Sequence, residues 1–527
     1  MRIACVGGGP GGTFFASLIK QMNPDWEVTV FERNRSDDTF GFGVVFSDST
    51  LANLSQSDSV LKERLSDVGQ HWDSIEVRIK GSVSQCGGNG MAAIPRKDLL
   101  QLLYQRAGEV GVMMRFSTPV EEFESLDQFD LVVCSDGANS MLRTTHAGKF
   151  RPTIDVARAK FIWFGTTYRF NGLTFLFRQS PDGVFAVHGY PIDDSRGTFI
   201  VETDEETWKR AGMDGFDPAT PPGVSDEFSK SYLEELFSDE IDGHQLLVNN
   251  SRWGNFRTIK NQSWHYKNFV LIGDSAHTAH FSVGSGTKMA LEDASALAAA
   301  FAGYSGDLDQ TLQTYEDSRR PGVDHIQGSA KPSLRWWENF GTFYQMLSPE
   351  QFSVHFFTRA ITLGRLSRRD QAFVEDSLRW WKSNYRESPL ESQFDLSGLV
   401  ILSRTVEVKY DENGSCWATF KSSNGFESIK LVTNWGESIL KDCGVIVTIS
   451  QDQDGFEKAA AEIEDIAKKD PVVIAIAGGD HSDRRSLGEM CKLIYRIPTL
   501  IVEDQTDRDL GETLILSGRT DFVGWRR

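Results

Sequence analysis

The sequence is poor in cysteine and contains no long apolar run, and both absences exclude classes of protein. Only 6 of the 527 residues are cysteine, and none forms a Cys-x-x-Cys pair, which disfavours zinc ribbons and dithiol redox motifs. No apolar stretch approaches the roughly 18 residues of a membrane span. The N-terminus lacks the apolar region of a signal peptide. We therefore expect a cytoplasmic protein with no metal site and no membrane association.

Positive charge is also scarce. Lys and Arg number 55 against 74 Asp and Glu, which gives a formal net charge of −19. An acidic balance of this size disfavours nucleic acid as a partner. What the sequence does have is 40% hydrophobic residues over a length too great for one core. Two or three folded units are therefore expected.

The chain opens with the pattern strand, glycine turn, helix, second strand. The turn is Gly7-x-Gly9-x-x-Gly12, and Glu32 closes the second strand. Glycines let a pyrophosphate approach the backbone at a helix N-terminus, where free N–H groups and the helix dipole favour negative charge. An acidic residue after the second strand can bond a ribose hydroxyl. The pattern predicts a Rossmann-like unit for FAD or NAD.

Two later motifs favour FAD because they resemble patterns of flavoprotein hydroxylases. DGANSMLR (136–143) follows a strand, and GDSAH (273–277) precedes GSGT (284–287) and a long helix. An Asp at a strand end can accept hydrogen bonds from ribityl hydroxyls, and a helix N-terminus can stabilise reduced flavin. Aromatic and β-branched segments between the motifs predict an antiparallel sheet. The cofactor residues expected here are Asp136, Gly273, Asp274, Gly284, Gly286 and Thr287.

Residues 1 to about 385 resemble the group A FAD-dependent aromatic monooxygenases of the para-hydroxybenzoate hydroxylase fold. Within this class GFGVVFSD (41–48), HGYPIDD (188–194) and TFIVETDEETWKRAG (198–212) are most similar to the salicylyl-CoA 5-hydroxylase and 2-aminobenzoyl-CoA (anthraniloyl-CoA) monooxygenase family. The resemblance implies an α/β fold. Its FAD-binding segments would span about 1–155 and 260–385, with an antiparallel substrate-binding sheet at about 156–259.

The same resemblance implies the reaction. NADH or NADPH would reduce FAD, and O2 would give a flavin C4a-hydroperoxide that hydroxylates or epoxidises an electron-rich ring. The implied substrate is an aryl-CoA thioester such as salicylyl-CoA or 2-aminobenzoyl-CoA. A free aromatic intermediate of secondary metabolism (a quinolone, indole or tropone precursor) stays open. So do a non-catalytic FAD-binding redox or interaction protein and assembly as a homodimer.

Further cofactor contacts follow from the resemblance. Arg96 heads a predicted helix and is expected to contact FAD, and Arg33 is expected on the adenosine side. Gly43 and Val44 belong to a segment that resembles the mobile stretch beside the isoalloxazine. The chain also departs from many group A enzymes, because His280 and its neighbour stand where those enzymes carry a proline pair.

Two histidines and a tyrosine are the candidate catalytic side chains: His188, His280 and Tyr190. Histidine titrates near neutrality and can bond a phenol or an amine. Three aromatic residues, Trp163, Trp253 and Phe281, are expected in the substrate pocket, although aromatic residues in strands are equally typical of a core.

The chain continues beyond a linker expected at 386–395. Residues 396–527 alternate strands and helices, and their two ends resemble the ends of an old-yellow-enzyme-like barrel. A (β/α)8 barrel takes about 250 residues, so the middle of such a barrel would be missing. We expect a small α/β domain resembling a shortened TIM barrel, retained for stability, for dimerisation or to cover the substrate channel.

Overall fold

The computed structural model forms two compact units. It describes residues 1–39, 41–122, 126–217, 220–221, 223–412, 415–433, 443–452 and 454–526. Unit 1 comprises Met1–Glu76 and Asn89–Glu338, and unit 2 comprises Val77–Gly88 and Asn339–Arg527. The division falls inside the long helix α10 (Leu308–Met346), ahead of the linker expected at 386–395. Residues 413, 414 and 527 of the barrel-like segments lie outside the described residues.

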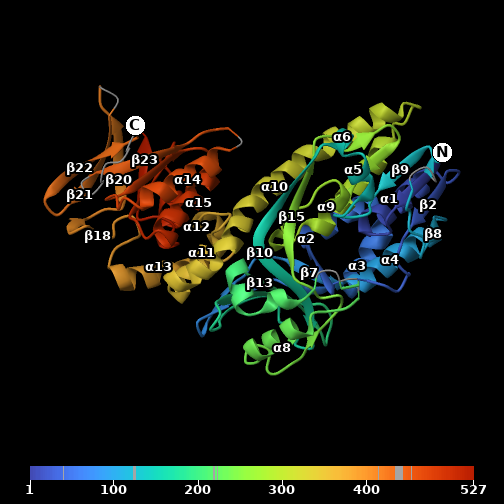
Figure 1. The fold of residues 1–527 in the computed structure, drawn as a ribbon, viewed down its shortest axis with the longest axis horizontal. Helices are drawn as coiled ribbons and strands as arrows, with labels where there is room; N and C mark the ends of the chain where they lie inside the picture. The colour runs from blue at the N-terminus through green and yellow to red at the C-terminus, as the bar shows by residue number, and fades with distance from the viewer. Residues whose placement is uncertain are drawn as a thin grey trace. The chain divides into compact units, whose positions relative to one another are not determined.

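Unit 1 contains a mainly parallel sheet, whose strands β9, β2 and β8 are labelled beside the N-terminus in Figure 1. Its order is β16-β17-β9-β1-β2-β8, and only β16 runs antiparallel to its neighbour. The buried, apolar β1 and β9 are typical of strands covered on both faces, which confirms the expected α/β fold. The strands are β1 (Arg2–Val6), β2 (Glu27–Phe31), β8 (Met113–Arg115), β9 (Leu131–Cys134), β16 (His265–Tyr266) and β17 (Phe269–Leu271).

Helices α1 and α9 pack closely beside this sheet. Pro10 begins α1 at a position where a missing N–H costs nothing, and Gly11 allows the contact because an added Cβ would lie 3.2 Å from the Ala290 carbonyl oxygen of α9. The packing places the N-termini of both helices at the carboxyl edge of the sheet, where α/β folds bind ligands. Besides the part of α10 that belongs to it, this unit has the helices α1 (Pro10–Met22), α2 (Asp48–Ser57), α3 (Ser59–Val68), α4 (Arg96–Glu109), α5 (Met141–Thr145), α6 (Ala147–Phe150), α7 (Glu205–Arg210), α8 (Glu227–Leu236) and α9 (Gly286–Phe301).

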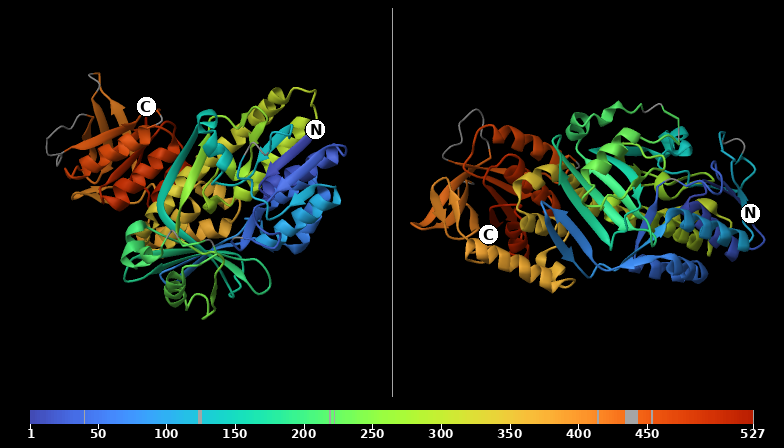
Figure 2. Two further views of the ribbon diagram at one scale, coloured as in Figure 1. Left: turned by 45° about the vertical axis from the view of Figure 1, so that its right-hand side comes forward. Right: turned by 90° about the horizontal axis from the view of Figure 1, so that it is seen from below.

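The predicted antiparallel sheet is present, with β14-β10-β13-β12-β11 in order and β15 also paired with β10. Its two faces differ. One packs an apolar cluster together with α8, and the other carries aromatic and polar side chains. Figure 2 shows the helices of this region, in green, beside the sheet. The strands are β10 (Pro152–Thr166), β11 (Leu173–Gln179), β12 (Val184–Pro191), β13 (Gly197–Thr203), β14 (Leu246–Leu247) and β15 (Gly254–Asn261). A smaller sheet joins β3 (Gly43–Ser47), β7 (Met91–Pro95) and β4 (Gln70–Trp72).

Unit 2 contains a seven-stranded barrel, and its likeness to a shortened TIM barrel is not confirmed. Strands β22, β23, β24, β25, β26 and β20 run parallel in that order, and antiparallel β21 closes the ring between β20 and β22. The antiparallel strand arises because the connections from β20 to β21 and from β21 to β22 are too short to contain a crossover helix. The strands are β20 (Thr405–Tyr410), β21 (Cys416–Ser422), β22 (Gly425–Val432), β23 (Gly444–Ile449), β24 (Ile474–Gly478), β25 (Thr499–Glu503) and β26 (Phe522–Arg526).

Apolar side chains such as Ile446, Ala475, Leu500 and Phe522 pack together in this barrel. Neighbouring residues of β23 and β24 pack instead against α14 and α15. The remaining elements of the unit are β5 (Ile75–Ile79), which straddles the unit boundary, β6 (Ser82–Cys86), α11 (Pro349–Phe357), α12 (Leu363–Ser367), α13 (Gln371–Tyr385), β18 (Phe394–Leu396), β19 (Leu399–Ile401), α14 (Gly455–Ala467), α15 (His481–Glu489) and α16 (Arg508–Leu516).

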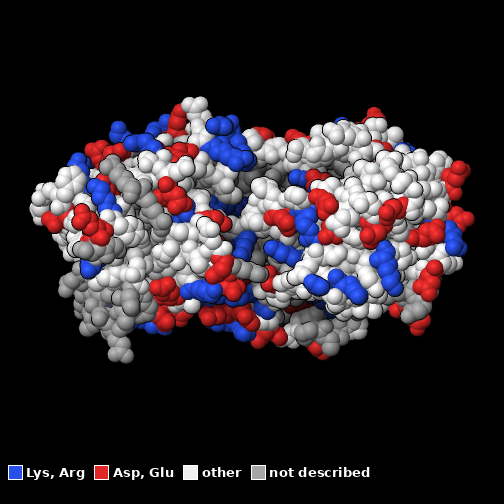
Figure 3. Space-filling model, turned by 90° about the horizontal axis from the view of Figure 1, so that it is seen from above, with Lys and Arg blue, Asp and Glu red and all other residues white. Residues whose placement is uncertain are grey.

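Charged side chains of both signs lie on the surface. Acidic and basic side chains are interspersed over the face drawn in Figure 3. Within the described ranges, no helix has both the length and the apolar character needed to cross a membrane.

Candidate functional site

A cleft of about 360 Å³ opens at the carboxyl edge of the parallel sheet. Its walls come from the ends of β1, β2 and β9 and from the start of α4, so motifs distant in sequence meet there. Of the residues expected to hold a cofactor, Gly7, Gly9, Glu32, Arg33, Arg96 and Asp136 line this cleft.

The three glycines of the turn have different structural roles. Gly7 has φ +103°, and a Cβ there would lie 2.4 Å from the Ser135 carbonyl oxygen. Gly12 packs equally tightly, because its added Cβ would lie 2.1 Å from Ser135 Oγ. Around Gly9, no heavy atom of the described residues lies within 4 Å of the added Cβ. Gly7 and Gly12 therefore build the turn, and Gly9 leaves its backbone open to a ligand.

Glu32 braces the glycine turn from the end of β2. Its Oε2 accepts a hydrogen bond from the Gly8 N–H at 2.7 Å, and its Oε1 accepts from the Asn34 backbone and side-chain amides at 2.8 and 2.7 Å. The carboxylate also lines the cleft, where a ribose hydroxyl is expected. The Glu32 side chain therefore both orders the turn and lines the cleft in which the nucleotide is expected.

Asp136 lies at the end of β9 and has one unused acceptor. Its Oδ2 accepts from the Met141 N–H at 2.8 Å, while its buried Oδ1 has no hydrogen-bond partner among the described residues. Burial raises the pKa of this carboxyl, against hydrogen bonds that lower it. An unsatisfied buried acceptor costs free energy unless a donor fills it, and a nucleotide hydroxyl would be such a donor. The open acceptor of the cleft therefore fits a hydroxyl group of a nucleotide cofactor such as FAD.

Arg143 ties the two flavoprotein motifs together. It is 3% exposed and donates from Nη1 to the Ser275 carbonyl at 2.9 Å and from Nη2 to the Ala138 carbonyl at 2.5 Å. Ser275 Oγ donates in turn to the Cys134 carbonyl at the end of β9. These contacts fix the DG motif against the GD motif.

The GD motif presents an open carboxylate beside a helix N-terminus. The Asp274 side chain is exposed to solvent, but many protein atoms surround it. The resulting loss of hydration raises the pKa of its carboxyl, and the charge of Arg96 partly opposes this increase. An exposed side chain in crowded surroundings indicates a concave site. Gly284 and Gly286 face open space at the start of α9, where among the described residues no side chain caps the N-terminus. Thr287 lies in the first turn of this helix.

His277 has a structural position next to this motif. Its Nε2 lies 2.8 Å from Asp293 Oδ2, the same oxygen that accepts from the Gly273 N–H at 2.8 Å. Arg319 donates to the other oxygen of Asp293 at 2.9 Å. The network anchors the GD turn to α9 and α10.

The two candidate histidines meet at a residue that the sequence reasoning missed. His188 Nε2 lies 2.6 Å from Glu202 Oε2, and His280 Nε2 lies 3.4 Å from Glu202 Oε1. The three side chains are 4%, 2% and 1% exposed, respectively. Burial raises the pKa of Glu202, but the hydrogen bonds and charges of both histidines outweigh it and lower the pKa to about 2. The carboxylate is thus anionic at neutral pH.

Strand register explains this meeting. In β13, Glu202 pairs with Ala186 of β12 and with Phe161 of β10, while Ile200 pairs with His188. Side chains alternate along each strand, so Glu202, His188 and Phe161 lie on one face. An acidic residue inside the apolar run GTFIVET was the only sequence signal for Glu202.

Aromatic rings enclose the network. Phe281 lies 4.4 Å from His280 and 5.4 Å from His188 between ring centroids, and Trp337 lies 4.3 Å from His188. Trp163 belongs to the same face and lies 6.4 Å from Phe281. The expected pocket residues Trp163 and Phe281 therefore come together.

Trp253 and Tyr190 differ from their expected roles. Trp253 donates to Ser229 Oγ at 2.7 Å and packs with the α8 cluster on the opposite face. Tyr190 is on the correct face, but its hydroxyl donates to the Gly43 carbonyl at 3.1 Å and burial raises its pKa. It therefore fastens the Gly43–Val44 segment to the sheet and is a poor acid or base.

Comparison with known proteins agrees with this geometry. Residues 128–328 match a family model described as FAD binding domain. The chain is 49% identical to salicyloyl-CoA 5-hydroxylase of a Streptomyces species over 99% of both chains. It is 36% identical to 3-hydroxy-4-methyl-anthranilyl-[aryl-carrier protein] 5-monooxygenase of Streptosporangium sibiricum, covering 64% of this chain and 89% of that protein. The structure of 2-methyl-3-hydroxypyridine-5-carboxylic acid oxygenase shares the fold, with a TM-score of 0.52, 18% identity, and coverage of 64% of this chain and 92% of that one.

Proposed function

Because this chain belongs to the family of salicyloyl-CoA 5-hydroxylase and related FAD-dependent monooxygenases, we propose that it hydroxylates an aromatic ring presented as a coenzyme A thioester. The enzyme is an FAD-dependent aromatic monooxygenase that uses NAD(P)H and O2. The observation that carries the choice of an aryl-CoA is similarity to the salicyloyl-CoA enzyme along the whole chain, unit 2 included.

The residues of the cleft would hold the cofactor. Gly9 and the N-terminus of α1 would receive the pyrophosphate, and Glu32 a ribose hydroxyl. The open acceptors of Asp136 and Asp274 would receive hydroxyl groups, and the N-terminus of α9 would face the flavin. Bound FAD supplies the redox chemistry that activates O2.

The side chains of the sheet face have two tasks. The aromatic layer of Trp163, Phe281 and Phe161 would shield the reacting ring from water, which competes with oxygen transfer. The histidines beneath this layer would accept a proton from the hydroxyl or amino group of the substrate, which makes the ring more electron-rich.

Reduction and product analysis test this proposal. Purified enzyme would be mixed with NADH or NADPH in a stopped-flow instrument, with and without salicylyl-CoA and 2-aminobenzoyl-CoA. After O2 is added, the masses of the products would be measured by mass spectrometry. We expect faster flavin reduction with an aryl-CoA and a product heavier by one oxygen atom. The free acids are matched controls. If neither thioester changes the rate of flavin reduction and H2O2 is the only product, the aryl-CoA proposal is wrong. Carrier-protein thioesters and free aromatic metabolites would then be the substrates to test.

We also propose that the barrel of unit 2 is retained for stability. Arg519, which precedes β26, is completely buried and donates to Thr358 Oγ1 at 2.8 Å and to the His355 carbonyl at 2.5 Å beside α11. Removing residues 396–527 would strip these partners from α11 and expose its apolar side chains. We expect the truncated chain to aggregate. A truncated enzyme with unchanged melting temperature, oligomeric state and turnover would contradict this role.

A further inference from the structure

We propose that Glu202 is a positioning residue that joins His188 and His280 into one proton-accepting unit, and that Ser282 connects this unit to the substrate. The inference rests on the proposed hydroxylase function and adds two residues to it. It starts from the observation that one buried carboxylate contacts both imidazoles through their Nε2 atoms.

The contacts of His280 define its protonation. The Ser282 N–H donates to His280 Nδ1 at 3.4 Å, and Ser282 Oγ lies 2.8 Å from the same atom. Nδ1 therefore carries a lone pair, and the proton of the neutral ring is on Nε2, facing Glu202. His280 is oriented so that its available lone pair points away from the carboxylate and toward the serine.

Ser282 is the member of the network nearest to open space. It is half-buried, whereas both histidines and Glu202 are buried. It lies in the short turn Phe281–Val283, and its Oγ also lies 2.9 Å from Ser333 Oγ on α10. Its hydroxyl is the group through which a buried imidazole can exchange a proton with a ligand.

The proton balance is simple. The hydroxyl or amino group of the substrate gives one proton to Ser282 Oγ as the Ser282 hydroxyl proton moves to His280 Nδ1. The electron pair stays on the substrate and His280 becomes an imidazolium. Its Nε2–H continues to donate to Glu202, whose negative charge balances the new positive charge. Without that carboxylate a charged imidazole at this depth would be strongly disfavoured.

The surroundings of the histidines offer few other charges that could balance an imidazolium. The groups that set the charge state of Glu202 are His188 and His280. The rings packed on the histidines come from β11, β15, η4 (Phe281–Val283) and α10, and all are aromatic. They are Phe175, Phe256, Phe281 and Trp337.

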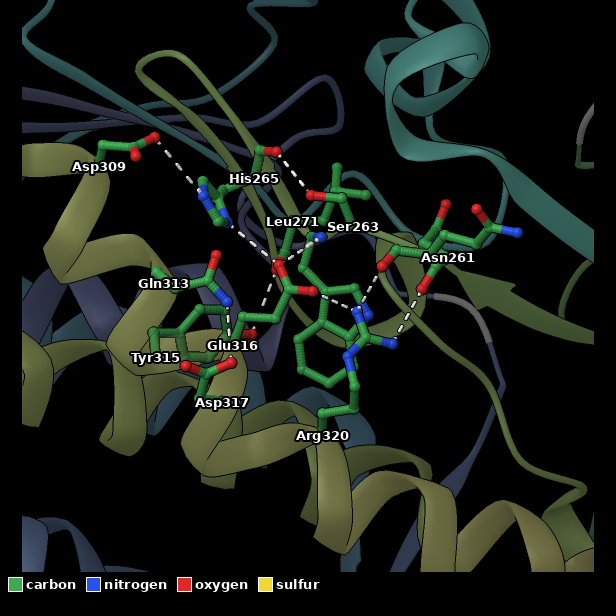
Figure 4. A network of polar contacts seen from close by, with 12 residues as sticks. Asn261, Ser263, His265, Leu271, Asp309, Gln313, Tyr315, Glu316, Asp317 and Arg320 are labelled. Atoms are coloured by element: carbon green, nitrogen blue, oxygen red, sulfur yellow. Dashed lines mark hydrogen bonds and ion pairs between the residues drawn. The ribbon is translucent and has the colours of Figure 1, made fainter.

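The substitution Glu202→Gln tests the inference because it keeps the shape of the side chain and removes its charge. Glu316→Gln is a matched control. Glu316 is also buried and bonds a histidine, accepting from His265 Nδ1 at 3.1 Å and from the Trp264 N–H at 2.8 Å, but it belongs to a structural network on α10 (Figure 4). Both variants lose a buried carboxylate from a His–Glu contact in unit 1.

The first readout does not require turnover. The imidazole signals of His188 and His280 would be followed by NMR as the pH changes, with single His→Gln variants for assignment. In Glu202→Gln both should titrate lower by about 1–3 pH units, and in Glu316→Gln neither should move.

The second readout is the pH profile of kcat. In Glu202→Gln we expect kcat to fall roughly 10–100-fold with KM little changed, and the acid limb of the profile to move to lower pH. Glu202→Asp, which restores the charge, should recover part of both. Ser282→Ala serves if Glu202→Gln does not fold, and should lower kcat while leaving the NMR titration of His188, which Ser282 does not contact, unchanged.

The outcomes separate this inference from the proposed function. If the wild type hydroxylates no aryl-CoA, the proposed function fails, while the NMR titrations still decide whether Glu202 controls the histidines. If Glu202→Gln keeps wild-type titrations and a wild-type pH profile, Glu202 is only structural and the inference is overturned.

Discussion

A pair of glycine-to-alanine substitutions should separate cofactor binding from folding. Gly9 has φ −70° and ψ 178°, which alanine adopts without strain, and an added Cβ meets no described atom within 4 Å. Alanine restricts the unfolded chain, which stabilises by about 0.4–1 kcal/mol, but is a poorer N-cap than glycine by a similar amount. The free energy of unfolding of the FAD-free Gly9→Ala protein should therefore change by less than about 1 kcal/mol.

Binding of FAD should respond very differently to the same methyl group. The added carbon would project into the cleft and displace a pyrophosphate from the N–H groups at the start of α1. Losing one charge-assisted hydrogen bond costs about 1.5–3 kcal/mol, which corresponds to roughly 10–150-fold weaker binding. Gly12→Ala is the matched partner, because its Cβ would lie 2.1 Å from Ser135 Oγ and should destabilise the fold by about 1–3 kcal/mol.

The assay needs two measurements on FAD-stripped protein. Guanidinium unfolding gives the stability of each variant, and titration with FAD followed by flavin fluorescence gives the dissociation constant. We expect Gly9→Ala to fold like the wild type and bind FAD weakly, and Gly12→Ala to unfold at lower denaturant. Wild-type FAD affinity in Gly9→Ala would refute the placement of the pyrophosphate at this glycine.

Three further predictions concern buried polar groups. The pKa of Glu202 is lowered from 4.5 to about 2, so its carboxylate stabilises the fold by about 3 kcal/mol above pH 4.5. This stabilisation is lost as the pH falls from 4.5 to about 2. The free energy of unfolding should therefore differ less between pH 6 and pH 3 in Glu202→Gln than in the wild type. Arg519→Met should lower the free energy of unfolding by about 3–5 kcal/mol, because it leaves Glu489, which now accepts from Arg519 Nε at 2.6 Å, without its partner; chemical denaturation measures this. Asp136→Asn should weaken FAD binding by about 1–3 kcal/mol in the same fluorescence titration, whereas unchanged affinity would mean that the open Oδ1 faces no cofactor hydroxyl.

The local motifs were predictable from the sequence because each depends on a few neighbouring residues. The glycine turn needs a positive φ at Gly7 and a close approach at Gly12, and only glycine satisfies both. The sequence also predicted the helix that Arg96 heads and the long helix that follows GSGT (284–287), which are α4 and α9. The family followed from these motifs taken together with their order along the chain.

The tertiary structure alone decided which distant side chains meet. Glu202 and His280 are far apart in sequence, and they converge because the register of β13 and the turn after the GD motif bring them to one face. The direction of Trp253 and the closure of β21 onto β22 are likewise set by packing and by strand pairing. Local propensity contains no information about such contacts, because their free energy comes from burial and pairing that exist only in the folded chain.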